Sequence, residues 1–372
     1  MQYAILIILI LLAIAKPRSK SVALLLVGYG TVLCAFCTES FDLRNYKAMF
    51  EMPEIYGEKM AFGWDIYLSL AIKSGISFTA FKAICSLITF ACTFCAIKKL
   101  TNKCTLVLGL YMLGLLLGQI TQIRFYMSSS MALVGIAYLS SGKKYSVIKY
   151  FFWMVLSISF HYSMVFGLIA LFARMWKSPK TMSALVVIVI ACEIVLLYSN
   201  ALYGIAMNII PDQTRVLQYL DFSEVFASLN IHTIKPILIL VLSHLAVFCG
   251  CRTLYKYNIV ESRILINNGS QSARARLSQI EFLYKIEIGL LILIPLYFRH
   301  NAFYRIFKNL VILIFVMASA LVVNKGNDKL VFKKLFQRGQ LIAIASSIMV
   351  FLVVGFIDQE WFTVLDSLSF SV

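Results

Sequence analysis

Two ionisable residues, Arg124 and His161, lie within long apolar stretches, where such residue types are rare. The segment 119–163 contains both, with the basic pair Lys143–Lys144 between them. A charged or imidazole side chain inside a membrane-spanning segment is costly and usually serves a function. Each of the two residues lies about midway between clusters of lysine and arginine. The pattern therefore predicts a polar site on the far side of a bilayer from those clusters.

Further polar residues are expected on the same side of the membrane. Guanidinium groups bind phosphate through a planar fork and remain charged when buried. A carboxylate or an imidazole can take a proton from an attacking sugar hydroxyl, or orient that hydroxyl. Together these groups suit glycosyl transfer from a lipid diphosphate, which needs an activated nucleophile and a stabilised leaving group. The residues expected there are Asp42, Tyr46, Asp65, Arg124, His161, Arg299, His300 and Arg305.

Each of these residues also has a purely structural interpretation. Arg124 could extend to the membrane surface from a helix end, or form an ion pair with an acid. His161 could be bonded to a neighbouring serine such as Ser157. The expected location on one side of the membrane is what favours a functional site. The remaining plain alternatives are solvated loop carboxylates for Asp42 and Asp65, and interfacial anchors for Arg299 and Arg305.

The composition requires lipid as the solvent for most of the chain. Of the 372 residues 61% are hydrophobic and only 14% are charged, and the mean hydropathy is +0.86. A soluble domain cannot bury that much apolar surface. The net charge of +17 is explained by asymmetry between loops on the two sides of the membrane. We therefore expect no nucleic-acid partner.

Basic residues recur in clusters that are separated by apolar lengths, whereas most acids lie elsewhere. A bias of lysine and arginine towards the cytoplasmic loops orients helices during insertion. We therefore expect all the clusters on the cytoplasmic side, and the long acidic segments on the other. The clusters lie within 16–20, 98–103, 143–149, 174–180, 252–285 and 325–338.

The spacing between clusters predicts pairs of crossings. About forty residues separate Lys103 from Lys143, enough for two spans of ~20 residues each. Only about thirty separate Lys144 from Arg174. Two crossings there would have ~15 residues, or roughly 22 Å, which is short of a ~30 Å hydrocarbon core. We expect a short hairpin that leaves His161 recessed, rather than a single crossing that would invert every later loop.

We therefore predict an all-α polytopic integral membrane protein with about twelve transmembrane helices. Residues 1–372 form a single membrane domain, with outer loops at 38–78 and 200–232 and an inner loop at 251–278, where 267–270 carries a turn signal. The expected helices lie near 2–15, 21–37, 79–97, 105–122, 125–141, 146–160, 162–175, 182–199, 233–250, 279–298, 303–323 and 340–357.

No motif of a soluble enzyme or a metal site competes with this interpretation. The sequence has no Walker A motif, no HExxH and no GxSxG. His232 and His244 are isolated, and the nine cysteines form no disulfide framework. We therefore expect no metal and no cofactor.

Several short motifs, in this order along the chain, resemble the EpsG-like, Wzy-type polymerases of bacterial surface polysaccharides such as O-antigen and capsule. Each motif is short, so the resemblance rests on their order and their expected membrane side. Two positions depart from the common pattern: Phe125 stands where many members have glutamine, and Asp65 where glutamate is commoner. The motifs are Asp42-Leu-Arg-Asn-Tyr46, Phe62-Gly-Trp-Asp-Ile-Tyr67, Gln122-Ile-Arg-Phe-Tyr-Met-Ser-Ser-Ser-Met-Ala-Leu133, Gly142-Lys-Lys-Tyr145, Ser159-Phe-His-Tyr-Ser163 and Asn301-Ala-Phe-Tyr-Arg305.

The resemblance implies an inverting, metal-independent transferase in the bacterial cytoplasmic membrane, with its site facing the periplasm or the exterior. Such enzymes pass a growing glycan from undecaprenyl diphosphate onto the next lipid-linked repeat, and related membrane enzymes often have a GT-C-like architecture. By this analogy Arg124 and either Arg299 or Arg305 would hold the donor diphosphate, while His161 or Asp42 would assist the acceptor hydroxyl. Tyr46, Asp65, Gln122 and His300 would also contact substrate.

Three other functions remain open from the sequence. An O-antigen ligase, or another lipid-phosphate-dependent glycosyltransferase, would differ in acceptor rather than in mechanism. A flippase or transporter of lipid-linked oligosaccharide would show charges along the spans and an internal repeat, and a membrane acyltransferase would leave the outer arginines without a role. Membrane lipid and a chain-length regulator are the other partners that we expect.

Overall fold

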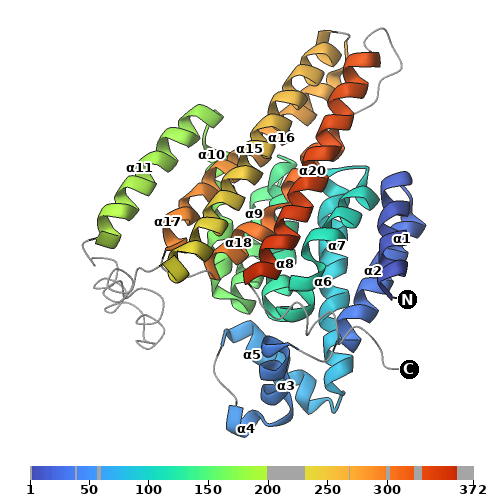
Figure 1. Ribbon diagram of the computed structural model, residues 1–372, viewed down its shortest axis with the longest axis vertical. Coiled ribbons are helices and arrows are strands. Elements are labelled where there is room, and N and C mark those ends of the chain that lie inside the picture. The colour runs from blue at the N-terminus through green and yellow to red at the C-terminus, as the bar shows by residue number, and fades with distance from the viewer. Residues whose placement is uncertain are drawn as a thin grey trace.

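The protein is a bundle of helices in the computed structural model, which describes residues 2–37, 40–56, 60–198, 231–267, 269–298, 302–321 and 329–357 (Figure 1). These residues contain no strand. The all-α class predicted from composition is therefore confirmed for the described chain.

Helices lie at each of the segments expected to cross the membrane. They are α1 (Gln2–Ala15), α2 (Lys20–Phe36), α6 (Phe78–Leu100), α7 (Cys104–Thr121), α8 (Ile123–Ser140), α9 (Ser146–Phe160), η1 (Tyr162–Leu168) with α10 (Ile169–Met175), α11 (Pro179–Tyr198), α15 (Ile231–Asn267), α16 (Gln271–Leu290) with η2 (Leu291–Leu293) and α17 (Ile294–Tyr297), α18 (Ala302–Leu310) with α19 (Ile312–Ala320), and α20 (Lys329–Ile357).

Among the described residues, six helical stretches are long and apolar enough to cross a membrane. They are Phe78–Leu100, Cys104–Thr121, Pro179–Leu196, Ile234–Asn267, Phe303–Ala320 and Leu330–Val353. Four more apolar helices, including α1 and α9, are shorter than a full span. The count of twelve crossings and the GT-C-like architecture stay predictions.

The two described segments that we expected as long loops are largely helical. The outer segment 38–78 contains α3 (Phe41–Glu51), α4 (Pro53–Tyr56) and α5 (Phe62–Lys73), which lie together at one end of the bundle (Figure 1). The inner segment 251–278 consists of the end of α15 and the start of α16. Gly269 has a φ of +85° at the turn between these helices, a conformation that favours glycine. Most of the expected outer loop 200–232 lies outside the described residues.

The short hairpin at 144–174 is confirmed by contacts between its two arms. Tyr150 on the ascending arm donates a hydrogen bond to the carbonyl of Gly167 on the returning arm, at 2.9 Å. Arg174, at the end of α10, lies against Gly142, where a Cβ would be 3.0 Å from Nη2. The chain therefore returns to its starting level, and His161 lies at the tip of the hairpin between α9 and η1.

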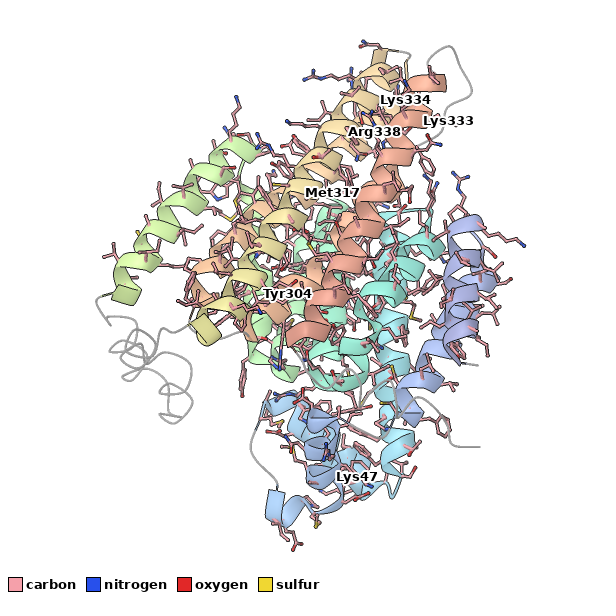
Figure 2. The ribbon with its side chains drawn as sticks, viewed as in Figure 1. Lys47, Tyr304, Met317, Lys333, Lys334 and Arg338 are labelled. Atoms are coloured by element: carbon pink, nitrogen blue, oxygen red, sulfur yellow. The ribbon has the colours of Figure 1, made fainter. Side chains whose placement is uncertain are left out.

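The expected inner clusters gather at the end of the bundle opposite α3. Figure 2 shows Lys333, Lys334 and Arg338 at this end and Lys47 of α3 at the other. The turn after α1 reaches the start of α7, because Thr105 donates to the carbonyl of Ser19 at 2.7 Å. The basic clusters therefore share one end, as their sequence pattern predicts.

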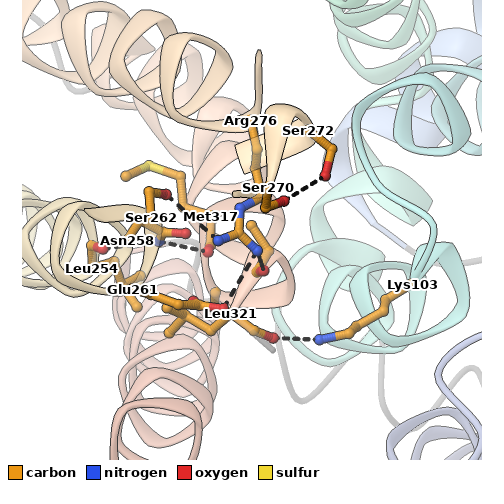
Figure 3. Close-up of polar contacts among 12 residues, drawn as sticks. Lys103, Leu254, Asn258, Glu261, Ser262, Ser270, Ser272, Arg276, Met317 and Leu321 are labelled. Atoms are coloured by element: carbon orange, nitrogen blue, oxygen red, sulfur yellow. Dashed lines mark hydrogen bonds and ion pairs between the residues drawn. The ribbon is translucent and has the colours of Figure 1, made fainter. Parts of the chain in front are cut away.

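At this basic end, the last carbonyls of α19 are capped by side chains from other helices (Figure 3). Lys103 donates to the carbonyl of Leu321, Arg276 donates to that of Ala320 at 3.0 Å, and Asn258 donates to that of Met317 at 3.1 Å. Carbonyls at a helix C-terminus lack partners within the helix and carry partial negative charge. The three side chains therefore hold α7, α15 and α16 against one helix end.

Close packing of α7 against α20 makes Gly114 a position where added volume is costly. A Cβ there would lie 3.0 Å from the backbone oxygen of Ser347, whereas a Cβ on Gly28 of α2 would meet nothing within 4 Å. Alanine raises helix propensity by about 1 kcal/mol at either site. We expect Gly28→Ala to leave thermal stability unchanged or higher. Gly114→Ala should lower it by about 1–3 kcal/mol, through overpacking against backbone.

Thermal unfolding of both variants in the same detergent measures this difference. Equal melting temperatures for the two variants would contradict the α7–α20 contact.

Candidate active site

A cavity of about 410 Å³ lies beneath α3, at the end of the bundle away from the basic clusters. Four separate parts of the chain contribute to it: α3 and the segment after it, the α7–α8 junction, the hairpin tip and α18. The lining residues are Asp42, Asn45, Tyr46, Ala48, Met49, Ile55, Met60, Gln122, Arg124, Phe125, His161 and Arg305. Six of the nine residues predicted for the site therefore meet in one cavity.

Gln122 and Arg124 enter the cavity from the junction of two helices. α7 ends at Thr121 and α8 begins at Ile123, with Gln122 alone between them. In the described part of the chain, the buried Oε1 of Gln122 and Nε of Arg124 have no hydrogen-bond partner. Buried polar atoms are normally satisfied. The two residues line the cavity, whereas these two atoms are enclosed by the surrounding protein.

His161 interrupts the hairpin with an extended backbone, at φ −154° and ψ 113°. Its Nδ1 is 2.7 Å from the hydroxyl of Ser163, and Phe125 meets the ring edge-on at a centroid distance of 5.1 Å. Burial, together with the positive charges of Arg124 and Arg305, lowers the pKa of His161 to about 3. The imidazole is therefore neutral at physiological pH and acts in hydrogen bonding rather than as a charge.

Ser157, which we considered as a partner of His161, is bonded to Ser128 of α8 instead. The Ser128 hydroxyl donates to the Ser157 carbonyl at 2.6 Å, and the Ser157 hydroxyl donates to the Ser128 carbonyl at 2.8 Å. Both serines are fully buried. Ser128 lies four residues after Arg124 and Ser157 four residues before His161, so each serine shares a helix face with its site residue. That spacing is the sequence signal that could have revealed the pair.

Asp42 and Tyr46 reach the cavity from one face of α3, because residues four apart lie one above the other on a helix. The Ser40 hydroxyl accepts from the backbone N–H of Leu43 at 3.1 Å and caps this helix. Burial raises the pKa of the Tyr46 phenol, and the positive charge of Arg124 opposes that rise. The α3 face thus lies within the influence of the Arg124 charge at the α7–α8 junction.

Arg305 is placed by the aromatic packing of α18 against α15. His244 is stacked on Phe307 with ring centroids 3.6 Å apart, and its Nδ1 is 2.7 Å from the Tyr297 hydroxyl. Ser243 donates to the Tyr304 hydroxyl at 3.1 Å. These contacts hold the residues on either side of Arg305 and so place the start of its side chain at the cavity wall.

The remaining predicted site residues are not in the cavity lining. Asp65 accepts from the backbone N–H of Met60 with both carboxylate oxygens, each at 3.2 Å. It therefore supports Met60, which does line the cavity. Arg299 and His300 lie outside the described residues.

No group of three or more His, Cys, Asp or Glu side chains that could hold a metal ion occurs in the described residues. Positive charge in the cavity comes from two guanidinium groups. The arrangement offers anion binding by Arg124 and Arg305, a carboxylate at Asp42, and hydrogen bonding by Tyr46, Gln122 and His161.

The apolar helices define a membrane protein, and the cavity adds two guanidinium groups at one end of its bundle. The chain belongs to the EpsG family, whose model matches residues 23–362. No match was found among curated proteins or among solved structures. Family membership confirms the resemblance seen in the motifs, and it indicates a polysaccharide polymerase-like membrane protein of the glycosyltransferase kind.

The low pKa of His161 can be tested by NMR of protein labelled at histidine. Because burial and two arginines disfavour the imidazolium, we expect the His161 signals not to titrate between pH 8 and pH 5. An unperturbed imidazole titrates near pH ~6.5. Comparison with His161→Gln assigns the signal, and a midpoint near pH ~6.5 would show that the ring is not enclosed between the arginines.

Proposed function

We propose that the protein transfers a growing glycan from undecaprenyl diphosphate onto a lipid-linked oligosaccharide repeat at the outer leaflet of the bacterial cytoplasmic membrane. The observation that carries this proposal is the convergence of Asp42, Arg124, His161 and Arg305 in one cavity. Two guanidinium groups, a carboxylate and a neutral imidazole match the needs of a diphosphate leaving group and a hydroxyl nucleophile.

The donor diphosphate binds to Arg124 and Arg305. Guanidinium groups stay charged on burial and offer paired N–H donors that match phosphate oxygens. Their charges stabilise the negative charge that develops on the diphosphate as the glycosidic bond breaks. This arrangement supports leaving-group stabilisation by arginine without a divalent cation.

The acceptor hydroxyl attacks the anomeric carbon of the donor sugar from the face opposite the diphosphate. A new C–O bond forms, the bond to the diphosphate oxygen breaks, and the electron pair leaves with the diphosphate. Asp42 takes the hydroxyl proton, because its carboxylate is the basic group of the cavity, whereas His161 is too weak a base at a pKa of about 3. Attack from the opposite face inverts the anomeric centre.

His161 and Gln122 orient the acceptor sugar. With Nδ1 engaged by Ser163, the other ring nitrogen remains for a sugar hydroxyl. Gln122 contributes a second polar side chain to the same cavity lining. A hydroxyl held between such groups needs little reorganisation before it attacks.

The orientation of the site follows from the charge distribution. Lysine and arginine clusters mark the cytoplasmic side of membrane proteins, and here they gather at the end away from the cavity. The cavity therefore faces the periplasm or the exterior, where lipid-linked repeats are joined.

Removal of one guanidinium should abolish polymer formation while the protein still accumulates. We expect Arg124→Ala to reduce polymerisation by about 10²–10³-fold, as when a preorganised charge-stabilising donor is lost. The assay uses purified protein in nanodiscs with a lipid-diphosphate-linked repeat, without nucleotide sugar and with a metal chelator, and products are read on a ladder gel. The control is Lys47→Ala, which removes an exposed lysine from α3 at the same end of the bundle. Polymer of normal length made by the Arg124→Ala variant would rule out the role of Arg124 in binding the donor diphosphate.

Asp42→Asn tests the general base separately from binding. The amide keeps the shape of the side chain but cannot take the proton, so we expect turnover to fall while lipid-linked donor still binds. Glu51→Gln is the matched control, because it neutralises an exposed acid of the same helix, which lies 3.8 Å from Lys47. Equal activity of Asp42→Asn and Glu51→Gln would assign the base elsewhere.

A further inference from the structure

A second pocket, of about 440 Å³, opens between α10 and α16 at the basic end of the bundle. Figure 1 shows these two helices side by side. The α10 side contributes Arg174, Met175, Trp176 and Lys177, and the α16 side contributes residues between Arg274 and Lys285. This pocket is separate from the candidate active site and has no part in the proposed reaction.

Positive charge dominates the second pocket. Arg174, Lys177, Arg274 and Lys285 line it, together with a single acid, Glu281. Lys285 is 3.8 Å from Glu281. Among the ion pairs of the described chain, none involves the other three cations. The pocket therefore carries an excess of positive charge that a bound anion would neutralise.

One cation of the pocket is buried, and the other three are exposed. Lys285 is only 7% exposed, and its ammonium donates to the carbonyl of Trp176 at 2.8 Å. This bond joins the two helices across the base of the pocket. Arg174 is held against the Gly142 turn, where it would lie 3.0 Å from an added Cβ. Lys285 is thus fixed by a bond between the two helices, while the exposed Arg174, Lys177 and Arg274 are accessible to an anion.

Apolar side chains at the rim place the pocket at the level of lipid headgroups. Met175 is 70% exposed and Trp176 is 37% exposed. Tryptophan is enriched at membrane interfaces, and the lysine clusters of this end mark the water side. A molecule in the pocket would therefore present an anionic group to the cations and an apolar part to the rim.

We propose that this pocket binds the phosphate of an anionic phospholipid headgroup from the leaflet on the basic side. Basic recesses between membrane helices are suited to phosphate headgroups, and arginine and lysine together provide both a planar fork and a point charge. The bound phosphate neutralises the repulsion between α10 and α16 and holds these helices together. The proposal stands whether or not the proposed function is right.

The site also lies on segments that continue to the candidate active site. η1 and α10 lead back to His161, and α16 continues through η2 and α17 towards α18, which carries Arg305. A headgroup that clamps α10 against α16 would thereby stabilise both arms that place those two residues.

The test compares lipid retention by native mass spectrometry of the full-length protein in detergent. Phosphatidylglycerol is titrated into wild type, Arg174→Gln/Arg274→Gln and a control, Lys333→Gln/Lys334→Gln. The control removes two exposed lysines of α20 from the same end of the bundle (Figure 2). We expect the pocket variant to bind phosphatidylglycerol about 30-fold more weakly, equivalent to about 2 kcal/mol for two cations. The control should bind as wild type does.

Two further ligands in the same experiment identify the source of the phosphate. Zwitterionic phosphatidylcholine should bind weakly to all three proteins, and millimolar inorganic phosphate should not displace phosphatidylglycerol. Displacement by inorganic phosphate would make this a small-anion site and overturn the lipid assignment. Unchanged phosphatidylglycerol binding in the pocket variant, or an equal loss in the control, would overturn the site. If Arg174→Gln/Arg274→Gln unfolds at a lower temperature than wild type, Lys177→Gln/Arg274→Gln replaces it, because that variant keeps Arg174 beside the Gly142 turn.

Discussion

The mutual hydrogen bonding of Ser128 and Ser157 is the constraint on which the candidate site depends. Water is absent from the interior of a membrane bundle, so each serine hydroxyl must find a protein acceptor. Here each hydroxyl uses the other residue's backbone carbonyl. Two bonds of opposite direction fix the register of α8 against α9. One helical turn beyond the pair lie Arg124 and His161, so their separation follows from a contact that neither of them makes.

The length of the hairpin explains why a polar cavity can exist at this depth. α9 has 15 residues, about 22 Å at helical rise, and cannot reach across a ~30 Å hydrocarbon core. The space left at its tip is covered by α3 and α5. Gly63 of α5 lies so close to the end of α9 that a Cβ there would be 3.0 Å from the carbonyl oxygen of Ser159. The short hairpin, together with α3 and α5, thus encloses polar side chains that would be costly to expose to lipid.

Much of this organisation could be predicted from the positions of charges between apolar runs. Helix locations, the short hairpin and the grouping of basic clusters follow from span length and charge bias, which act on individual segments. The sequence also indicated Asp42, Tyr46, Gln122, Arg124, His161 and Arg305 as site residues. The sequence placed connecting segments at 38–78 and 251–278 but not the bounds of the helices within them, because charged residues there leave no long apolar run. The role of Asp65 could not be foreseen either, since its partner is a backbone N–H on Met60. Local contacts of that kind depend on three-dimensional register, which residue spacing does not encode.

The one-residue junction at Gln122 has a consequence for how members of such a family diversify. α7 is almost entirely buried among its neighbours, and α8 follows it with no flexible linker. The backbone at Arg124 is therefore held by the packed helices of the bundle and has little freedom to move. The opposite wall of the cavity is formed by Asn45, Ala48 and Met49 of α3, a helix at the end of the bundle. A change in the shape of the cavity would accordingly be accommodated on the α3 wall, without repacking of the membrane core.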